Sequence, residues 1–154
     1  MTKFEQFPPL LLVRAISLWL QGRIHFSPDQ AETVIKGDEE FMAFRKVTVI
    51  SHRNDTRIPG ALFKISFRFA RFSSRTNRLL SLIPIPAIIA QPGFICKTWL
   101  IGKNSGAFLG IYEWTSVEAA ENYLHSFPLR LMKGRAIPDT IDYEIIDLKN
   151  SSAN

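Results

Sequence analysis

A chain of 154 residues is long enough for one domain with a full hydrophobic core and too short for two ordinary domains. Its composition, 46% hydrophobic and 21% charged, is that of a globular protein, and a single cysteine, Cys96, excludes an intramolecular disulfide framework and an all-cysteine metal site. The net charge of +5 gathers in residues 1–80. We interpret this basic half as a solvated surface, with an anionic ligand, a membrane surface or nucleic acid as alternatives.

Residues 8–20, PPLLLVRAISLWL, are predicted to form an amphipathic helix. Its apolar residues recur at helical spacing: Leu11, Leu12, Ala15, Ile16, Trp19 and Leu20. The segment is shorter than the roughly 20 residues that span a bilayer, and Arg14 interrupts it. We expect the helix to dock on the domain or on a partner. Contact with a membrane surface through residues 8–20 is the alternative, because Trp and Leu beside arginines also suit an interface.

Residues 21–60 complete an amino-terminal extension, 1–60, that we expect to contain two helices and one strand and to pack on the core. Ser27 and Pro28 are typical of a helix start, and Gly37 of its end, so a helix is predicted over 28–36. The β-branched run over 44–51 predicts the strand.

The rest of the chain predicts a ferredoxin-like domain over residues 61–148, followed by a tail over 149–154. Its elements are a strand over 61–70, a helix over 73–82, strands over 94–101 and 107–114, a helix from 115, a basic connector over 129–138 and a strand over 141–148. This βαββαβ order is that of the split βαβ arrangement, an α+β fold.

The central strand over 94–101 carries apolar residues on both sides. Those predicted for one side are Ile95, Trp99 and Ile101, and those for the other are Phe94, Cys96 and Leu100. A sheet that is buried on both faces in so small a chain predicts a second layer, either from another subunit or from the amino-terminal elements.

Several motifs at fixed spacing resemble the YdhR-type mono-oxygenases, a family of the dimeric α+β barrel superfamily. They are Pro92-Gly93-Phe94, Lys97-x-Trp99, Gly106-x-x-x-Gly110-Ile111-Tyr112-x-Trp114, Glu118-x-Ala120 and Tyr123. The resemblance covers about residues 61–148 and leaves residues 1–60 outside the family pattern. It implies a homodimer whose sheets form a barrel, a small hydrophobic or aromatic ligand, and oxidation by O₂ with no metal or flavin cofactor.

Four residues of the paired central strands are candidates for the ligand site. Trp99, Tyr112 and Trp114 either belong to the core or line a pocket and stack on a flat ligand. Lys97 lies in a strand predicted to be buried on both faces, so its charge must reach solvent, a carboxylate or an anionic ligand.

Two further candidates lie on the predicted helices. His125 ends a helix, where it either caps the helix or exchanges a proton at a pocket mouth. Arg75 belongs to a basic run with interleaved phenylalanines, and we favour binding of an anion or a substrate carboxylate there over nucleic acid. The three histidines do not lie at metal-binding spacing, so no metal site is predicted.

The first functional hypothesis is a cytoplasmic, cofactor-independent mono-oxygenase-like homodimer that binds a small hydrophobic or aromatic molecule. Its alternative is a non-catalytic ligand-binding module, or one that docks through residues 8–20 on a partner or a membrane. Haem binding is a third option, although the sequence indicates no axial histidine.

Overall fold

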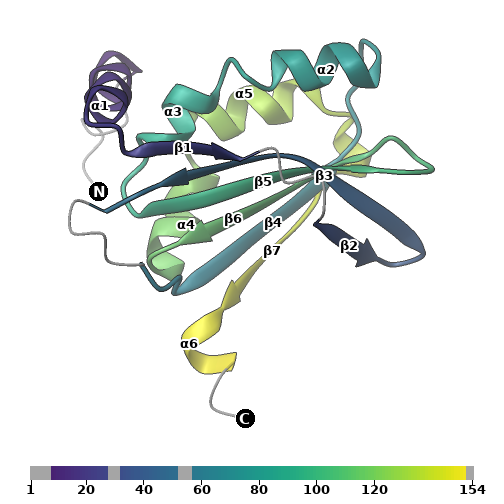
Figure 1. Ribbon diagram of the computed structural model, residues 1–154. Helices are drawn as coiled ribbons and strands as arrows, with labels where there is room; N and C mark the ends of the chain where they lie inside the picture. Colours follow the sequence, from purple (N-terminus) through teal and green to yellow (C-terminus); the bar gives the residue numbers. More distant parts are fainter. Residues whose placement is uncertain (1–7, 28–31, 52–56, 152–154) are drawn as a thin grey trace.

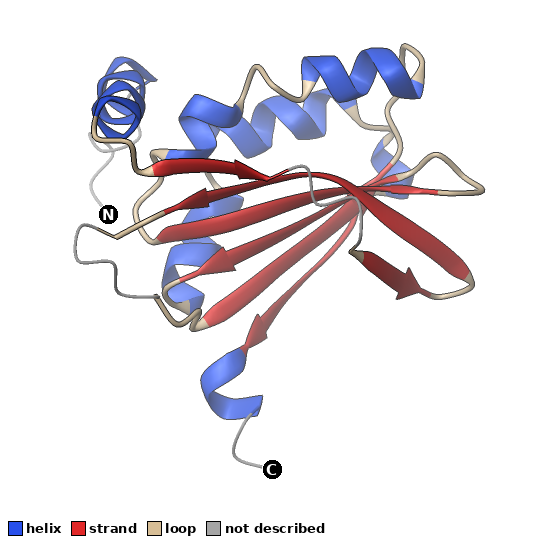
Figure 2. Cartoon of the chain, viewed as in Figure 1, coloured by secondary structure: helices blue, strands red, loops and turns tan. Residues whose placement is uncertain are grey.

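The computed structural model describes residues 8–27, 32–51 and 57–151, which form one antiparallel sheet with most of the helices on one face (Figures 1 and 2). The strands are β1 Ile24–Ser27, β2 Thr33–Lys36, β3 Glu39–Val49, β4 Ala61–Phe67, β5 Phe94–Gly102, β6 Phe108–Trp114 and β7 Asp142–Asp147. The α-helices are α1 Pro8–Leu20, α2 Ser74–Leu80, α3 Ile85–Ile89, α4 Val117–Leu124, α5 Phe127–Arg135 and α6 Leu148–Ser151, and a 3-10 turn covers Pro138–Thr140.

The strands follow the order β1-β3-β5-β6-β4-β7, with β2 paired to the start of β3. From β4 onward the chain order is strand, helices, strand, strand, helices, strand, and the spatial order β5-β6-β4-β7 is antiparallel throughout. The predicted ferredoxin-like α+β fold is therefore confirmed.

Strict alternation in β4 builds the core between the sheet and the helices. Phe63, Ile65 and Phe67 are buried at every second position, as their spacing predicts. The ring of Phe63 packs edge-on against Tyr123 of α4, with 5.8 Å between the centroids. A helix on the sheet is thus fixed by aromatic contacts from the apolar face of the strand.

The helix predicted over 28–36 is wrong in its described part, because residues 33–36 form the strand β2 and residues 28–31 lie outside the described residues. Lys36 pairs with Glu39, so Gly37 and Asp38 form a two-residue hairpin loop. Gly37 has a φ of 61°, which suits the first position of such a loop as well as the end of a helix. A glycine at this position in the sequence therefore fits either the end of a helix or a hairpin loop.

The described amino-terminal strands extend the same sheet, and β2 alone packs over part of its face away from the helices, where the second layer was predicted. On the face away from the helices, a small core forms from Phe41, Ala43, Leu100 and Leu109, with Val34 of β2 packed against it. Lys36 of β2 reaches across to β4 and β7, where its Nζ donates to Ser66 Oγ and forms an ion pair with Asp142, each at 2.6 Å. These contacts hold β2 of the same chain against part of the sheet face that lies away from the helices.

A register shift between Phe94 and Cys96 changes the predicted distribution of side chains on β5. Trp99 and Ile101 share the helix side as predicted, but Phe94 also belongs to this core and packs edge-on against Trp114, with 5.6 Å between the centroids. An extra residue in one strand reverses the side on which the preceding residues point, which alternation alone does not reveal.

The basic connector predicted over 129–138 is instead mostly the helix α5. Ser126 caps this helix by accepting from Leu129 N, and Pro128 lies in its first turn.

The helix α1 is confirmed over residues 8–20, and its buried residues are Leu11, Ala15 and Leu18. None of the described helices has both the length and the apolar character needed to cross a membrane.

Candidate functional site

A cavity of about 280 Å³ lies between the helix side of the sheet and the helical layer. Its floor comes from β4, β5 and β6, and its walls come from the segment joining α2 to α3 and from α5. Its lining is mostly apolar, with a few polar groups, and its size approaches the lower end of the range of about 300–1,000 Å³ that is typical of small-molecule sites.

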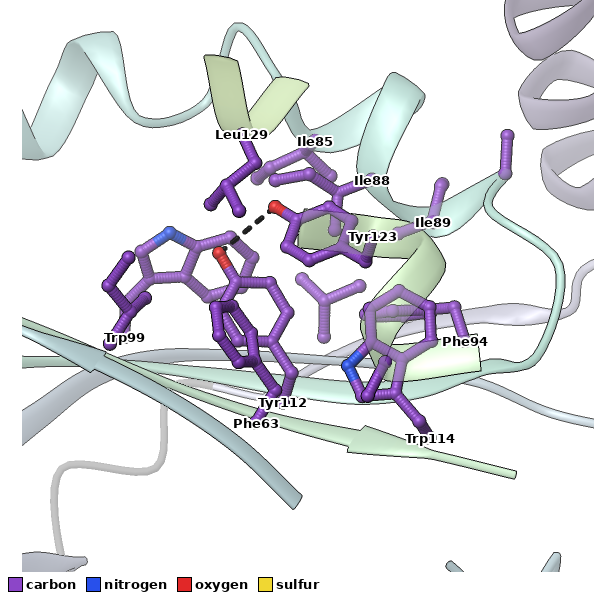
Figure 3. Close-up of a cluster of buried hydrophobic side chains, with 14 of the residues drawn as sticks. Phe63, Ile85, Ile88, Ile89, Phe94, Trp99, Tyr112, Trp114, Tyr123 and Leu129 are labelled. Carbon is purple, nitrogen blue, oxygen red and sulfur yellow. Dashed lines mark hydrogen bonds between the residues drawn. The ribbon is translucent and has the colours of Figure 1, made fainter. Parts of the chain in front are cut away.

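Aromatic rings from β5 and β6 line the floor of this cavity. Figure 3 shows these rings packed against Tyr123 and the helices. Tyr112 lies between neighbouring rings: Trp114 stacks near it with an interplanar angle of 13°, and Tyr123 lies with its ring centroid 5.0 Å away. The hydroxyl of Tyr123 donates to the hydroxyl of Tyr112 at 3.1 Å. Burial raises the pKa of both phenols, so both are neutral at neutral pH.

Gly110 keeps the floor open opposite Trp99, with which it pairs in the sheet. A Cβ at this position would lie 2.9 Å from Tyr112 Cε2 and 3.6 Å from Lys97 Cε. The missing side chain therefore makes room for the Tyr112 ring and for the lysine stem beside the cavity.

Lys97 is the buried charge of the cavity, with a relative exposure of only 5%. Its Nζ lies 4.3 Å from the ring centroids of both Trp99 and Tyr112. Within the described residues it has no hydrogen-bond acceptor and no carboxylate partner. Burial lowers the pKa of Lys97 well below its usual value, and the nearby charge of Arg45 lowers it further. The two rings stabilise the ammonium form of Lys97. The free-energy cost of removing its charge from water is larger than the gain from two cation–π contacts, so the pKa stays lowered.

Two arginines near this site were not among the sequence candidates. Arg135 of α5 lines the cavity, donates to Asn77 Oδ1 at 2.8 Å and lies 4.7 Å from the ring centroid of Phe69. Arg45 of β3 donates to Ser81 Oγ at 2.7 Å, and its guanidinium lies 5.6 Å from the Trp99 ring. Arg135 was missed because residues 129–138 were interpreted as a connector.

The structure brings some of the predicted site residues together and separates others. Lys97, Trp99 and Tyr112 line the cavity, and Trp114 lies behind Tyr112 without lining it. His125 is exposed at the end of α4, where its carbonyl accepts from Arg130, and Arg75 is exposed on α2. Neither His125 nor Arg75 lines the cavity, because these ends of their helices face solvent.

The lone cysteine lies on the opposite face of the sheet from this cavity. Cys96 is buried and accepts a hydrogen bond from Thr48 Oγ1 at 3.5 Å. Burial raises the pKa of the Cys96 thiol, and the thiol is less reactive than the thiolate. Among the described residues, no group of three or more His, Cys, Asp or Glu side chains could hold a metal ion.

Cys96 should therefore resist modification in the folded protein. We expect a thiol reagent such as dithionitrobenzoate to react at least tenfold more slowly with native protein than with protein in concentrated urea, because burial limits both access and ionisation. Absorbance at about 412 nm would follow the reaction, with free cysteine as the reference. Fast, complete labelling under native conditions would contradict the buried placement.

The fold and the cavity together define a ferredoxin-like α+β protein with an apolar, aromatic-walled cavity. No family model and no curated relative matches the sequence. Among solved structures, the chain is similar to the heme-degrading enzyme LmHde from Listeria monocytogenes, with a TM-score of 0.54, 12% identity and 73% of each chain covered.

It is also similar to an uncharacterized ferredoxin-fold protein related to antibiotic biosynthesis monooxygenases from Listeria monocytogenes 4b F2365. That match has a TM-score of 0.50 and 13% identity, and it covers 74% of this chain and 67% of the other. At these identities the likeness concerns the fold alone, which is the ferredoxin-like fold found in relatives of those monooxygenases.

Proposed function

We propose that this protein binds a small, flat, hydrophobic molecule with one acidic or enolisable group, and oxygenates it with O₂ without a cofactor of its own. The observation that carries the proposal is Lys97, a buried amine in an aromatic-walled cavity with no carboxylate partner among the described residues. The resemblance of residues 61–148 to the YdhR-type mono-oxygenases supports the same reaction class, and we propose the homodimer of that family as its assembly.

The cavity suits a flat aromatic ligand. Trp99 and Tyr112 line the cavity with aromatic carbon atoms against which such a ligand can pack, and the remaining lining is largely apolar. Arg135 lies at the edge of the cavity and can hold a carboxylate or phenolate oxygen of the ligand. A water-poor site of this kind strengthens each electrostatic contact made to the ligand.

Lys97 is the proposed catalytic base. Its lowered pKa lets a neutral amine exist at lower pH than for an exposed lysine, so Nζ can accept the proton that leaves an activated CH₂ group of the ligand. The ammonium that forms lies between two aromatic rings and beside the new carbanion or enolate, which it stabilises. The electron-rich anion then reacts with O₂, so that CH₂ becomes C=O and the second oxygen atom leaves as water.

Haem is the molecule that the heme-degrading relative acts on, and the cavity does not suit a histidine-ligated haem. No histidine lines the described cavity, and the described histidines, His25 and His125, are exposed on β1 and at the end of α4. The phenols of Tyr112 and Tyr123 are bonded to each other and have raised pKa values, which disfavours them as iron ligands.

A matched pair of lysine variants tests the proposal. Oxygen uptake would be followed with an electrode across phenolic and polyketide-like substrates. We expect Lys97→Met to lose roughly 10²–10⁴-fold in kcat, the usual contribution of a general base. Lys64→Met is the control, because Lys64 lies on the other face of the sheet, paired with Glu144 at 3.6 Å.

Equal activity of Lys97→Met and wild type would refute the role of Lys97. A non-catalytic binding module is the second candidate, because the proposed chemistry depends on one described lining residue alone, Lys97, whose lowered pKa favours the neutral amine. Ligands that quench the fluorescence of Trp99 while no substrate consumes oxygen would establish that alternative.

A further inference from the structure

The helix α1 buries one side and exposes an apolar stripe on the other. Leu11, Ala15 and Leu18 face the domain, where α1 contacts α3. The exposed stripe consists of large apolar residues at helical spacing: Leu12, Val13, Ile16, Trp19 and Leu20. Trp19 and Leu20 are 69% and 72% exposed, which is unusual for such side chains within one contiguous patch.

A basic cleft lies beside this helix. Arg14 of α1, Arg23 before β1 and Arg57 before β4 line it together with the polar side chains of Ser17, Gln21 and Gln91. Arg23 Nε donates to the carbonyl of Ile50 at 2.8 Å, and Arg57 donates to the carbonyl of Val49. Within the described residues, none of the three arginines has a carboxylate partner.

The three arginines concentrate positive charge in the cleft. Burial lowers the pKa of Arg57, and the charges of Arg23 and Arg14 lower it further, so the Arg57 guanidinium lies in the field of the other two. Three close cations without an acidic partner favour an anion with several oxygens, such as a phosphate diester, because guanidinium groups bind phosphate oxygens through paired hydrogen bonds.

We propose that α1 docks in the plane of an anionic lipid bilayer, with the apolar stripe in the acyl boundary and the basic cleft on the headgroup phosphates. Around the helix, Ser17 and Arg14 follow directly after the stripe, so the cleft borders it. Apolar residues with Trp on one side and arginines at the flank are the arrangement of interfacial helices. The thirteen residues of α1 are too few to span a bilayer, so the helix lies along the surface.

Charge favours a bilayer over a second copy of this chain on this face. A twofold interface between copies is self-complementary, so two α1 helices in contact would bring two basic clefts toward one another. An anionic leaflet instead offers the opposite charge, and each nearby arginine contributes about fivefold in affinity.

Vesicle co-sedimentation of the full chain tests this proposal. We expect the wild type to bind phosphatidylcholine vesicles that contain phosphatidylglycerol, and to bind pure phosphatidylcholine vesicles at least tenfold more weakly. Trp19→Ser with Leu20→Ser should abolish binding, and Arg14→Gln with Arg57→Gln should weaken it about 25-fold. Ile35→Ser is the matched control, because Ile35 is exposed on β2, away from α1, and this variant should bind like the wild type.

Tryptophan emission supplies a second readout. Trp99 and Trp114 are buried, so the emission of Trp19 alone should shift to the blue when anionic vesicles are added. Circular dichroism would check that every variant is folded. Absent binding, equal binding to both vesicle types, or binding unaffected by the α1 substitutions would overturn the proposal. Self-association that the Trp19→Ser and Leu20→Ser substitutions abolish, without vesicle binding, would identify a second copy as the occupant instead.

Discussion

Lys97→Met should raise the free energy of unfolding at neutral pH, by on the order of 1–4 kcal/mol, even though it removes a residue of the proposed site. Lys97 is buried without a carboxylate partner in the described structure, so folding must either desolvate its charge or remove its proton. Methionine fills a similar volume and packs well against the rings of Trp99 and Tyr112. Urea denaturation, analysed as a two-state transition, would measure the difference.

The stability difference between Lys97→Met and the wild type should depend on pH. The pKa of Lys97 is lowered in the folded protein, so between its folded value and its unfolded value of about 10.4 the unfolded chain binds a proton that the folded chain does not. The contribution of Lys97 to stability therefore rises with pH across that window, by at most about 1.4 kcal/mol per pH unit. The advantage of Lys97→Met should shrink as pH rises through this window.

Lys64→Met is the control for this measurement as well. Lys64 is partly exposed in an ion pair with Glu144, so its removal should change stability by less than about 1 kcal/mol and leave the pH slope intact. An equal slope for Lys97→Met and wild type would mean that Lys97 keeps its proton in the folded protein. The ammonium would then act as an anion-binding group rather than a base.

The sequence indicated Lys97 as a candidate site residue because its neighbours in the strand are apolar. This inference needed only the pattern of apolar residues in the strand. The ferredoxin-like order was predictable for the same reason: β4, β5 and β6 combine strong apolar alternation with clear turn residues. These three strands were therefore assigned correctly.

Other parts of the site depend on contacts that local signals do not contain. Gly37 fits a helix end and a hairpin loop equally well, and only pairing with β3 decides for the strand β2. Residues 129–138 were interpreted as a connector, whereas most of them belong to α5, so Arg135 was not predicted as a residue of the cavity. The cavity itself arises where helices from distant parts of the chain meet the sheet, which no single segment specifies.

Trp114→Ala should lower the free energy of unfolding by about 3–5 kcal/mol, the usual range for removing a buried aromatic ring. Trp114 is fully buried, with ring centroids 5.0 Å from Tyr123 and 5.6 Å from Phe94. Because Trp114 also supports Tyr112, we expect the same substitution to weaken ligand binding through the loosened cavity wall, although Trp114 does not line the cavity.

Trp114→Phe should cost far less than Trp114→Ala, because it keeps one aromatic ring and removes an unsatisfied donor. The indole Nε1 of Trp114 is buried and has no hydrogen-bond partner among the described residues, a state that costs about 1–3 kcal/mol. Removing this unsatisfied donor is favourable, and it offsets much of the free energy that is lost because phenylalanine makes fewer contacts than tryptophan. Urea denaturation of both variants would compare them, and an equal loss for the two would contradict the expected gain from removing Nε1. A ligand affinity retained in Trp114→Phe but lost in Trp114→Ala would identify the ring at this position as the support of Tyr112.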